Sequence, residues 1–108
     1  VDGVAELVDR RHVGDAVAMT FAVASDLGRF VAEKGSIAVS GVSLTVNHVA
    51  SAAGSVRFDV TLIPVTLAAT NLTLIARGDR VNLEVDLIAR YVARLMDTTV
   101  GGAIERTT

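Results

Sequence analysis

Apolar side chains recur at every second position in several short stretches of the chain, and this alternation restricts the possible folds more than any other feature. A period of two places the apolar residues on one face of an extended strand, as a half-buried strand requires. The stretches are also rich in valine, isoleucine and threonine, which suit the pleated surface of a sheet. Six strands are therefore predicted, over residues 4–8, 16–24, 36–39, 43–49, 55–63 and 81–85.

Turn residues separate the predicted strands. Glycine stands beside a polar residue at positions 14–15, 34–35, 40–41, 54–55 and 78–79. Because such pairs favour tight turns, the short strands predict a small antiparallel barrel or sandwich. A length of 108 residues corresponds to one domain, since domains commonly have roughly 100 to 200 residues. We expect this domain over residues 1–96, followed by a flexible tail rich in threonine and glycine over residues 97–108.

Two helices are expected beside the strands. Ser25 and Asp26 can cap a short helix that runs through Val31, because their side chains accept hydrogen bonds from first-turn amides. Residues 87–96 carry apolar side chains at spacings of three and four, which predicts an amphipathic C-terminal helix. The apolar face of this helix would serve as an oligomer contact or cover the open end of its own barrel.

The composition argues against several classes of function. Ten Lys and Arg residues against twelve Asp and Glu give a net charge of −2, so nucleic acid is not an expected partner. Apolar runs fall short of the roughly 18 residues of a membrane span, so no membrane is expected either. The chain has no cysteine, and His12 and His48 are isolated from other candidate ligands, so no metal site is predicted. The cytoplasm is the default compartment.

Polar residues inside the predicted strands are candidate functional groups. Ser43 and Thr45 stand two apart in an extended segment, so both hydroxyls project from the same face of the sheet. On a barrel exterior they would be merely solvated, whereas in a cleft they would offer paired donors and acceptors to a heterocycle. Asp86 follows the last predicted strand, where its side chain could equally cap the next helix.

A second candidate lies where the fifth predicted strand ends. Pro64 lacks an amide hydrogen and should end this strand, turning residues 63–66 into a loop whose free backbone groups a flat ligand could use. Thr66 and Thr70 are equally suited to be local turn or helix caps. The residues alone leave both interpretations open.

The order of short motifs along the chain is more specific than any single residue. The motifs are Lys34-Gly35-Ser36-Ile37, Gly41-Val42-Ser43-Leu44-Thr45-Val46, Leu62-Ile63-Pro64-x-Thr66-Leu67, Thr70-Asn71-Leu72 and Gly78-Asp79-x-Val81-Asn82-Leu83-Glu84-Val85-Asp86. In this order they resemble the riboflavin synthase family, in particular the carboxy-terminal of its two lumazine-binding repeats. Val1-Asp2-Gly3 resembles the end of the Gly-His-Val-Asp-Gly signature that opens this repeat. We therefore expect the chain to be a piece of a longer protein.

The resemblance implies an all-β fold, a six-stranded antiparallel Greek-key barrel with a short helix and a C-terminal helix. It implies an enzyme that converts two molecules of 6,7-dimethyl-8-ribityllumazine into riboflavin and 5-amino-6-ribitylaminouracil, with no cofactor. In the family, each site forms between the amino-terminal repeat of one subunit and the carboxy-terminal repeat of another, within a trimer. The expected partners are therefore the lumazine, riboflavin and the amino-terminal repeat of another copy.

The resemblance also implies roles for individual residues. Ser43 and Asp86 are expected to be catalytic, as a hydroxyl and a carboxylate that assist proton transfers and addition of a nucleophile. Most of the catalysis would be orientation, because two stacked heterocycles react as if within one molecule. The expected contacts to one lumazine are Val1, Lys34, Ser43, Leu44, Thr45, Ile63, Pro64, Val65, Thr66, Leu67 and Ala68.

Two positions depart from the family pattern, since Val65 stands where the family often has glutamate and Ser40 where it often has aspartate. One rival interpretation is a non-catalytic binding protein of the lumazine-protein type, which is similar over the same barrel and holds a lumazine or flavin without converting it. Another is a small interaction barrel without a ligand. The joint presence of Ser43, Thr45 and Asp86 favours the enzyme.

Overall fold

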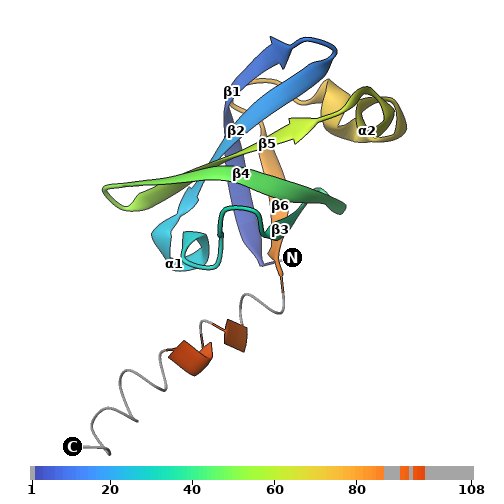
Figure 1. The fold of residues 1–108 in the computed structure, drawn as a ribbon. Coiled ribbons are helices and arrows are strands. Elements are labelled where there is room, and N and C mark those ends of the chain that lie inside the picture. Colours follow the sequence, from blue (N-terminus) through green and yellow to red (C-terminus); the bar gives the residue numbers. More distant parts are fainter. Residues whose placement is uncertain (1, 87–90, 93, 97–108) are drawn as a thin grey trace, which may run out of the picture.

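The computed structural model of the chain describes residues 2–86, 91, 92 and 94–96, and its main body is a closed barrel (Figure 1). The strands are β1 (Gly3–Val13), β2 (Ala16–Ala24), β3 (Ser36–Val39), β4 (Val42–Ala52), β5 (Ser55–Leu62) and β6 (Arg80–Val85). Around the barrel they follow the order β1, β2, β5, β4, β3, β6, and every neighbouring pair is antiparallel. The predicted six-stranded all-β barrel is confirmed, and the sandwich alternative is wrong.

Strand β5 pairs along its whole length with β2, while β6 lies between β3 and β1 and closes the barrel. Strands β1 and β4 are longer than predicted because each continues past a β-bulge, between Leu7 and Asp9 in β1 and between Val46 and His48 in β4. A bulge adds a residue and shifts the period-two pattern. Residues 9–13 of β1 and 50–52 of β4 therefore lie outside the predicted ranges, which ended at residues 8 and 49.

The alternating apolar side chains fill the interior of the barrel. Phe21 of β2 and Phe58 of β5 are paired in register and stack with ring centroids 5.5 Å apart. The buried side chains of these two strands include Val17, Met19, Phe21, Val23, Val56, Phe58, Val60 and Leu62, as the alternation predicted. Among the described residues no polar or charged side chain is buried. A polar ligand site must therefore lie outside this core.

Helix α1 (Ser25–Gly28) is shorter than predicted. Its N-cap is Ala24, so the predicted capping by Ser25 or Asp26 is wrong. The Asp26 carboxylate instead accepts a hydrogen bond from the N–H of Leu27, the next residue, at 2.9 Å. Residue 28, the last of the helix, is a glycine because the backbone approaches β5 closely there: a Cβ at Gly28 would lie 2.5 Å from the Val56 side chain.

The connection between β5 and β6, residues 63–79, contains two short helices where the sequence predicted a loop. They are α2 (Pro64–Ala69) and the 3-10 helix η1 (Asn71–Leu74). Pro64 ends the strand as predicted, and it also begins α2, because the first turn of a helix needs no amide hydrogen from that residue. This β5–β6 connection carries most of the predicted lumazine contacts.

Few side chains hold the β5–β6 connection in place. The Thr70 hydroxyl donates to the Thr66 carbonyl at 2.8 Å and accepts from the Leu72 N–H at 3.3 Å, which confirms Thr70 as a cap. Leu72 is 1% exposed and inserts into the core. Arg10 of β1 donates from Nη1 to the carbonyls of Leu72 and Ile75, at 3.3 and 2.6 Å. The connection is thus fastened through η1 and, at its far end, through backbone hydrogen bonds that join Gly78 and Asp79 to Leu7 of β1.

Only part of the predicted C-terminal helix can be compared with the structure. Residues 91, 92 and 94–96 are helical, whereas residues 87–90 and 93 lie outside the described residues, as does the predicted tail over 97–108. Tyr91 and Leu95 are 63% and 48% exposed, so these side chains do not cover the barrel. Nowhere in the described part of the chain is a helix long and apolar enough to span a membrane.

Candidate functional site

A depression of about 480 Å³ lies on the outer face of the barrel, where β3, β4 and β6 meet the start of the chain. Its lining residues are Asp2, Ser36, Ile37, Ala38, Ser43, Glu84, Val85 and Asp86. We call it the β3–β4–β6 depression. It brings together Ser43 and Asp86, the two residues predicted to be catalytic, although they come from distant parts of the sequence. Their predicted roles themselves stay predictions.

The register of the three strands explains the shape of this depression. Ala38 of β3 is paired with Ser43 of β4 on one side and with Glu84 of β6 on the other. These three residues form a row across the outer face, with the smallest side chain in the middle. Their neighbours Ile37 and Val85 are paired with each other and have buried side chains. The depression is therefore deepest at Ala38, and the polar side chains of Ser43 and Glu84 lie on either side of it.

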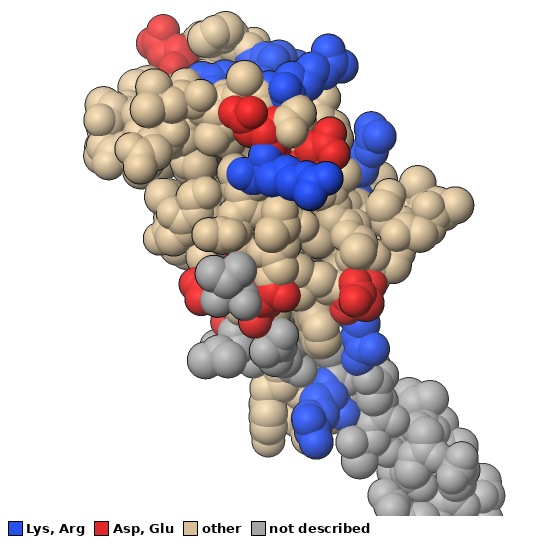
Figure 2. Space-filling model, turned by 180° about the vertical axis from the view of Figure 1, so that it is seen from behind, with Lys and Arg blue, Asp and Glu red and all other residues tan. Residues whose placement is uncertain are grey.

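The lining favours hydrogen bonding to a neutral, hydroxyl-rich ligand. It contains the carboxylates of Asp2, Glu84 and Asp86 and the hydroxyls of Ser36 and Ser43, but neither Lys nor Arg. Carboxylates accept hydrogen bonds, and serine hydroxyls both donate and accept. On the face of the molecule seen in Figure 2, several basic side chains gather at the upper edge, and basic and acidic side chains lie close together below it.

Two hydrogen bonds from Asp2, one from its backbone and one from its side chain, fix the end of β6. The Asp2 N–H donates to the Leu83 carbonyl at 2.9 Å, and Asp2 Oδ2 accepts from the Val85 N–H at 2.9 Å. Asp86 follows directly and is half-buried. The predicted contact Val1 lies outside the described residues, so the structure does not place it.

The other predicted contacts on β4 differ in orientation. Thr45 is exposed on the same outer face as Ser43, as their spacing predicted, and pairs with Ser36 of β3. This face is the exterior of the barrel, and Ser43 also lines a depression on it. The side chain of Leu44 points into the core and is 9% exposed. Leu44 could therefore contact a ligand on this face only through its backbone.

Lys34 occupies a tight turn before β3. Its φ of 67° lies in the left-handed region, and its N–H donates to the Val46 carbonyl at 2.7 Å. The Gly35 N–H closes the turn by donating to the Ala32 carbonyl at 3.0 Å. Lys34 is exposed and does not line the β3–β4–β6 depression. The turn places it beside β4, one residue along from Thr45.

The predicted contacts from Ile63 to Ala68 also lie outside the lining of the β3–β4–β6 depression. They belong to the end of β5 and to α2, where Ile63 and Val65 are 56% and 74% exposed. Leu67 is half-buried and packs against the core. A smaller hollow of about 200 Å³ separates this region from the β3–β4 turn. It is lined by Ser40, Val42, Ala69, Thr70, Asn71 and Leu72.

Sequence reasoning did not assign Asp2, Ser36 or Glu84 to the site. Glu84 alternates with buried residues of β6, which indicates an outward side chain but not the strand beside it. Only the pairing of Glu84 with Ala38, and of Ala38 with Ser43, places it opposite a predicted catalytic residue. Strand order is non-local information, and no local pattern in the sequence provides it.

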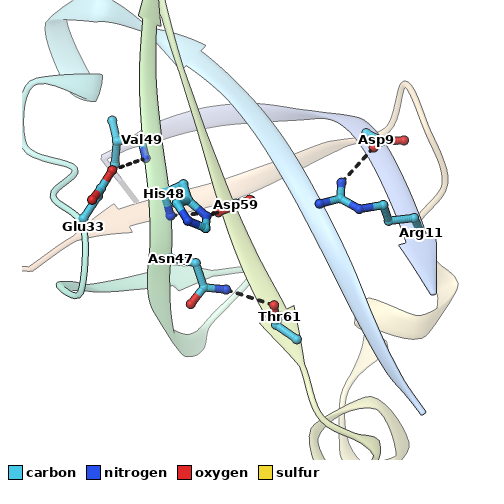
Figure 3. A network of polar contacts seen from close by, with 8 residues as sticks. All are labelled: Asp9, Arg11, Glu33, Asn47, His48, Val49, Asp59 and Thr61. Atoms are coloured by element: carbon cyan, nitrogen blue, oxygen red, sulfur yellow. Dashed lines mark hydrogen bonds and ion pairs between the residues drawn. The ribbon is translucent and has the colours of Figure 1, made fainter. Parts of the chain in front are cut away.

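A separate polar network lies on β4 and β5 around the β4 bulge (Figure 3). His48 contacts Asp59 through its N–H, at 2.8 Å, and through its ring Nδ1, at 3.3 Å. Asn47 Nδ2 donates to Thr61 Oγ1 at 2.9 Å. Within the described ranges, no group of three or more side chains could hold a metal ion. The network stabilises the bulge, and His48 is a strand histidine, as the sequence indicated.

Known proteins resemble this chain over most of its length. The family described as Lumazine binding domain matches residues 1–86. Riboflavin synthase of Brucella abortus (strain 2308) is 47% identical over 95 residues, which is 88% of this chain and 45% of that protein. Riboflavin synthase of Photobacterium phosphoreum is 41% identical over 96 residues, 89% of this chain and 42% of that protein. The chain thus spans less than half the length of these relatives.

Solved structures with the same barrel agree with the sequence matches. The crystal structure of LumP complexed with 6,7-dimethyl-8-(1'-D-ribityl) lumazine superimposes with a TM-score of 0.67 and 25% sequence identity, over 81% of this chain and 46% of that one. LumP complexed with riboflavin gives a TM-score of 0.64, at the same identity. The barrel, its outer depression and these matches lead to one conclusion: the chain belongs to the lumazine-binding domain family.

Proposed function

We propose that this chain forms the carboxy-terminal lumazine-binding repeat of a riboflavin synthase, a transferase that acts on two molecules of 6,7-dimethyl-8-ribityllumazine. The observation that carries the proposal is the meeting of Ser43 and Asp86 in the β3–β4–β6 depression. The relatives named riboflavin synthase, at 47% and 41% identity, support it. The ligand fits the lining, because the hydroxyls of its neutral ribityl chain can donate to carboxylates and exchange hydrogen bonds with serines.

The proposed reaction moves a four-carbon unit from one substrate molecule to the other. One lumazine gives up a four-carbon unit and leaves as 5-amino-6-ribitylaminouracil, and the other takes up that unit and becomes riboflavin. The first step removes a proton from the methyl group at ring position seven, and the resulting charge spreads into the heterocycle. The Ser43 hydroxyl and the Asp86 carboxylate are suited to assist the proton transfers and the addition of a nucleophile.

The proposed site needs a second surface. The β3–β4–β6 depression is open to solvent on the barrel exterior, so it can hold one face of a flat heterocycle and leaves the other in water. A second repeat from another copy, within a trimer, would cover that face and hold a second heterocycle against the first. The exposed side chains of Ile63 and Val65, beside the barrel wall, offer apolar surface for such a contact.

The alternative function is a carrier that holds a lumazine or riboflavin without converting it. The superposition on LumP, described in complex with each of these two ligands, favours this alternative. The two functions share the ligand and differ in turnover. They are separated by whether product forms once a complementary repeat is supplied.

The test is a fluorescence titration of the 108-residue chain with 6,7-dimethyl-8-ribityllumazine, with riboflavin formation followed in the same sample. We expect saturable binding without turnover, and turnover after addition of an amino-terminal repeat. Ser43→Ala and Asp86→Asn should lower turnover by more than they lower affinity, because they remove groups that serve the chemistry.

A matched control is Ser51→Ala, which removes a hydroxyl from an exposed position of the same strand, outside the depression. Its affinity and turnover should equal those of the unchanged chain. Binding with no turnover in the presence of the complementary repeat would favour the carrier. Absence of saturable binding, or equal effects of Ser43→Ala and Ser51→Ala, would contradict the assigned site.

A further inference from the structure

Asp2 extends the pairing between the start of the chain and the end of β6. Gly3 and Leu83 are the last pair of the β1–β6 ladder at this end of the strand. The bond from the Val85 N–H to Asp2 Oδ2, at 2.9 Å, lies two residues further along β6. A carboxylate oxygen therefore accepts this hydrogen bond in the place where a longer β1 would offer a backbone carbonyl.

This bond matters for the site because Asp86 is the next residue. On the other side of β6, Val85 is paired with Ile37 of β3. Val85 is thus held from both neighbouring strands, by Ile37 on one side and by the Asp2 side chain on the other. The chain leaves the barrel wall from this fixed point, and Asp86 lines the depression immediately beyond it.

We propose that Asp2 is a positioning residue for Asp86, acting through the Val85 N–H. The hydrogen bond fixes the end of β6 so that the Asp86 side chain stays in the β3–β4–β6 depression, which Ser43 also lines. What this bond requires of Asp2 is an acceptor oxygen, not a charge. The inference rests on the proposed function, because it presumes that Asp86 contacts the ligand.

Two substitutions separate the acceptor from the charge. Asp2→Asn keeps an acceptor oxygen at the same position and removes the charge, whereas Asp2→Ala removes both. Affinity for 6,7-dimethyl-8-ribityllumazine should fall about tenfold in Asp2→Ala, as expected if the displaced Asp86 carboxylate loses one hydrogen bond to the ligand, and stay within about twofold in Asp2→Asn. Equal losses in both variants would overturn the proposal, as would an unchanged affinity in Asp2→Ala.

A matched control guards against a general loss of stability. Asp79 makes the same kind of bond elsewhere, since its Oδ2 accepts from the Ala76 N–H at 2.8 Å, far from the depression along the β5–β6 connection. Asp79→Ala should lower the melting temperature about as much as Asp2→Ala and leave lumazine affinity unchanged. A loss of affinity in Asp79→Ala equal to that in Asp2→Ala would show that Asp2 affects binding only through stability, against the proposal.

A double substitution tests whether Asp2 acts through Asp86. If it does, the chain carrying both Asp2→Ala and Asp86→Ala should bind the lumazine no more weakly than Asp86→Ala alone, because Asp86→Ala already removes the side chain that Asp2 positions. Independent, additive losses would overturn the proposal.

Hydrogen exchange distinguishes failure of this inference from failure of the proposed function. The Val85 amide should be protected in the unchanged chain and in Asp2→Asn but exchange faster in Asp2→Ala, with the Asp86 amide resonance displaced only in Asp2→Ala. If the unchanged chain fails to bind the lumazine while these NMR changes occur, the proposed function is wrong and the positioning of Asp86 stands. If the Val85 amide is equally protected in all three chains, the positioning proposal is wrong whatever the ligand.

Discussion

The barrel wall and the β5–β6 connection are stabilised in different ways. In the wall, every strand buries alternate side chains, and backbone ladders join it to two neighbours. In the connection, α2 buries no residue at all, and one deeply buried side chain, Leu72, anchors the segment. The remaining anchors are hydrogen bonds from side chains such as Arg10 and Thr70, two partly buried side chains, Leu67 and Ile75, and backbone hydrogen bonds from the end of the segment to Leu7.

This difference indicates where the molecule can adjust. Segments with few buried contacts open locally at lower free energy than the core that carries them. The β3–β4–β6 depression belongs to the wall, whereas the predicted contacts from Ile63 to Ala68 belong to the connection. A ligand bridging the two would meet a fixed surface on one side and an adjustable one on the other.

The largest expected effect is on the wall. Phe58→Ala removes one ring of the stacked pair at the centre of the core and should lower the free energy of unfolding by about 3 to 5 kcal/mol. Urea denaturation measures this loss. The contrasting change in the connection, Val65→Ala, alters a side chain that is 74% exposed and should stay within about 0.5 kcal/mol. Similar losses in both variants would remove the distinction between the two regions.

The next effect concerns the anchor of the connection. Leu72→Ala leaves a cavity beneath η1 and should destabilise the protein by about 2 to 5 kcal/mol. Hydrogen exchange should show its largest increase over residues 63–79, with a smaller change in β2 and β5. Uniform loss of protection throughout the barrel would mean that the connection is part of the same cooperative unit as the wall.

A smaller effect is expected where β1 meets the connection. Arg10→Met removes the hydrogen bonds to the carbonyls of Leu72 and Ile75 and should lower the free energy of unfolding by about 1 to 3 kcal/mol. Its neighbour Arg11 pairs with Asp9 on the surface at 3.1 Å, so Arg11→Met should change stability by less than about 1 kcal/mol. Thermal denaturation of the two variants compares them directly. A larger loss in Arg11→Met would contradict the anchoring role of Arg10.

The smallest expected effect is a gain in stability at a turn of the barrel wall. Ser40 and Gly41 form the β3–β4 turn with φ values of 49° and 82°, and asparagine tolerates this left-handed conformation better than serine. Ser40→Asn should therefore stabilise the protein by about 0.5 kcal/mol, measured as a rise in melting temperature. A lower melting temperature would show that the Ser40 side chain makes a contribution that the turn geometry does not explain.

The two regions also differ in how far the sequence predicted them. Period-two alternation located all six strands, with the bounds of β2 and β3 exact to the residue, because burial in a barrel wall depends on local spacing. Helix α2 has only six residues, none of them fully buried, and no apolar period, so nothing in its pattern distinguished it from a loop. Pro64 was interpreted only as a strand terminator, although a helix start permits the same residue.

The candidate site shows the same limit. Ser43 and Asp86 were linked by resemblance to a family, and their meeting in one depression depends on the order β4, β3, β6 around the barrel. Glu84 and Asp2 enter the depression through that same order and through one side-chain hydrogen bond to Val85. Such pairings join distant parts of the chain, and local patterns carry no information about them.

Mapping where the ligand binds tests most directly whether the β3–β4–β6 depression is the binding site. Amide resonances of the 108-residue chain would be followed by NMR while 6,7-dimethyl-8-ribityllumazine is added. We expect the largest shifts around Ala38, Ser43 and Val85, with smaller ones in α2. Shifts centred instead on the opposite side of the barrel, around Thr20 and Arg57, would contradict the assignment of the site to the β3–β4–β6 depression.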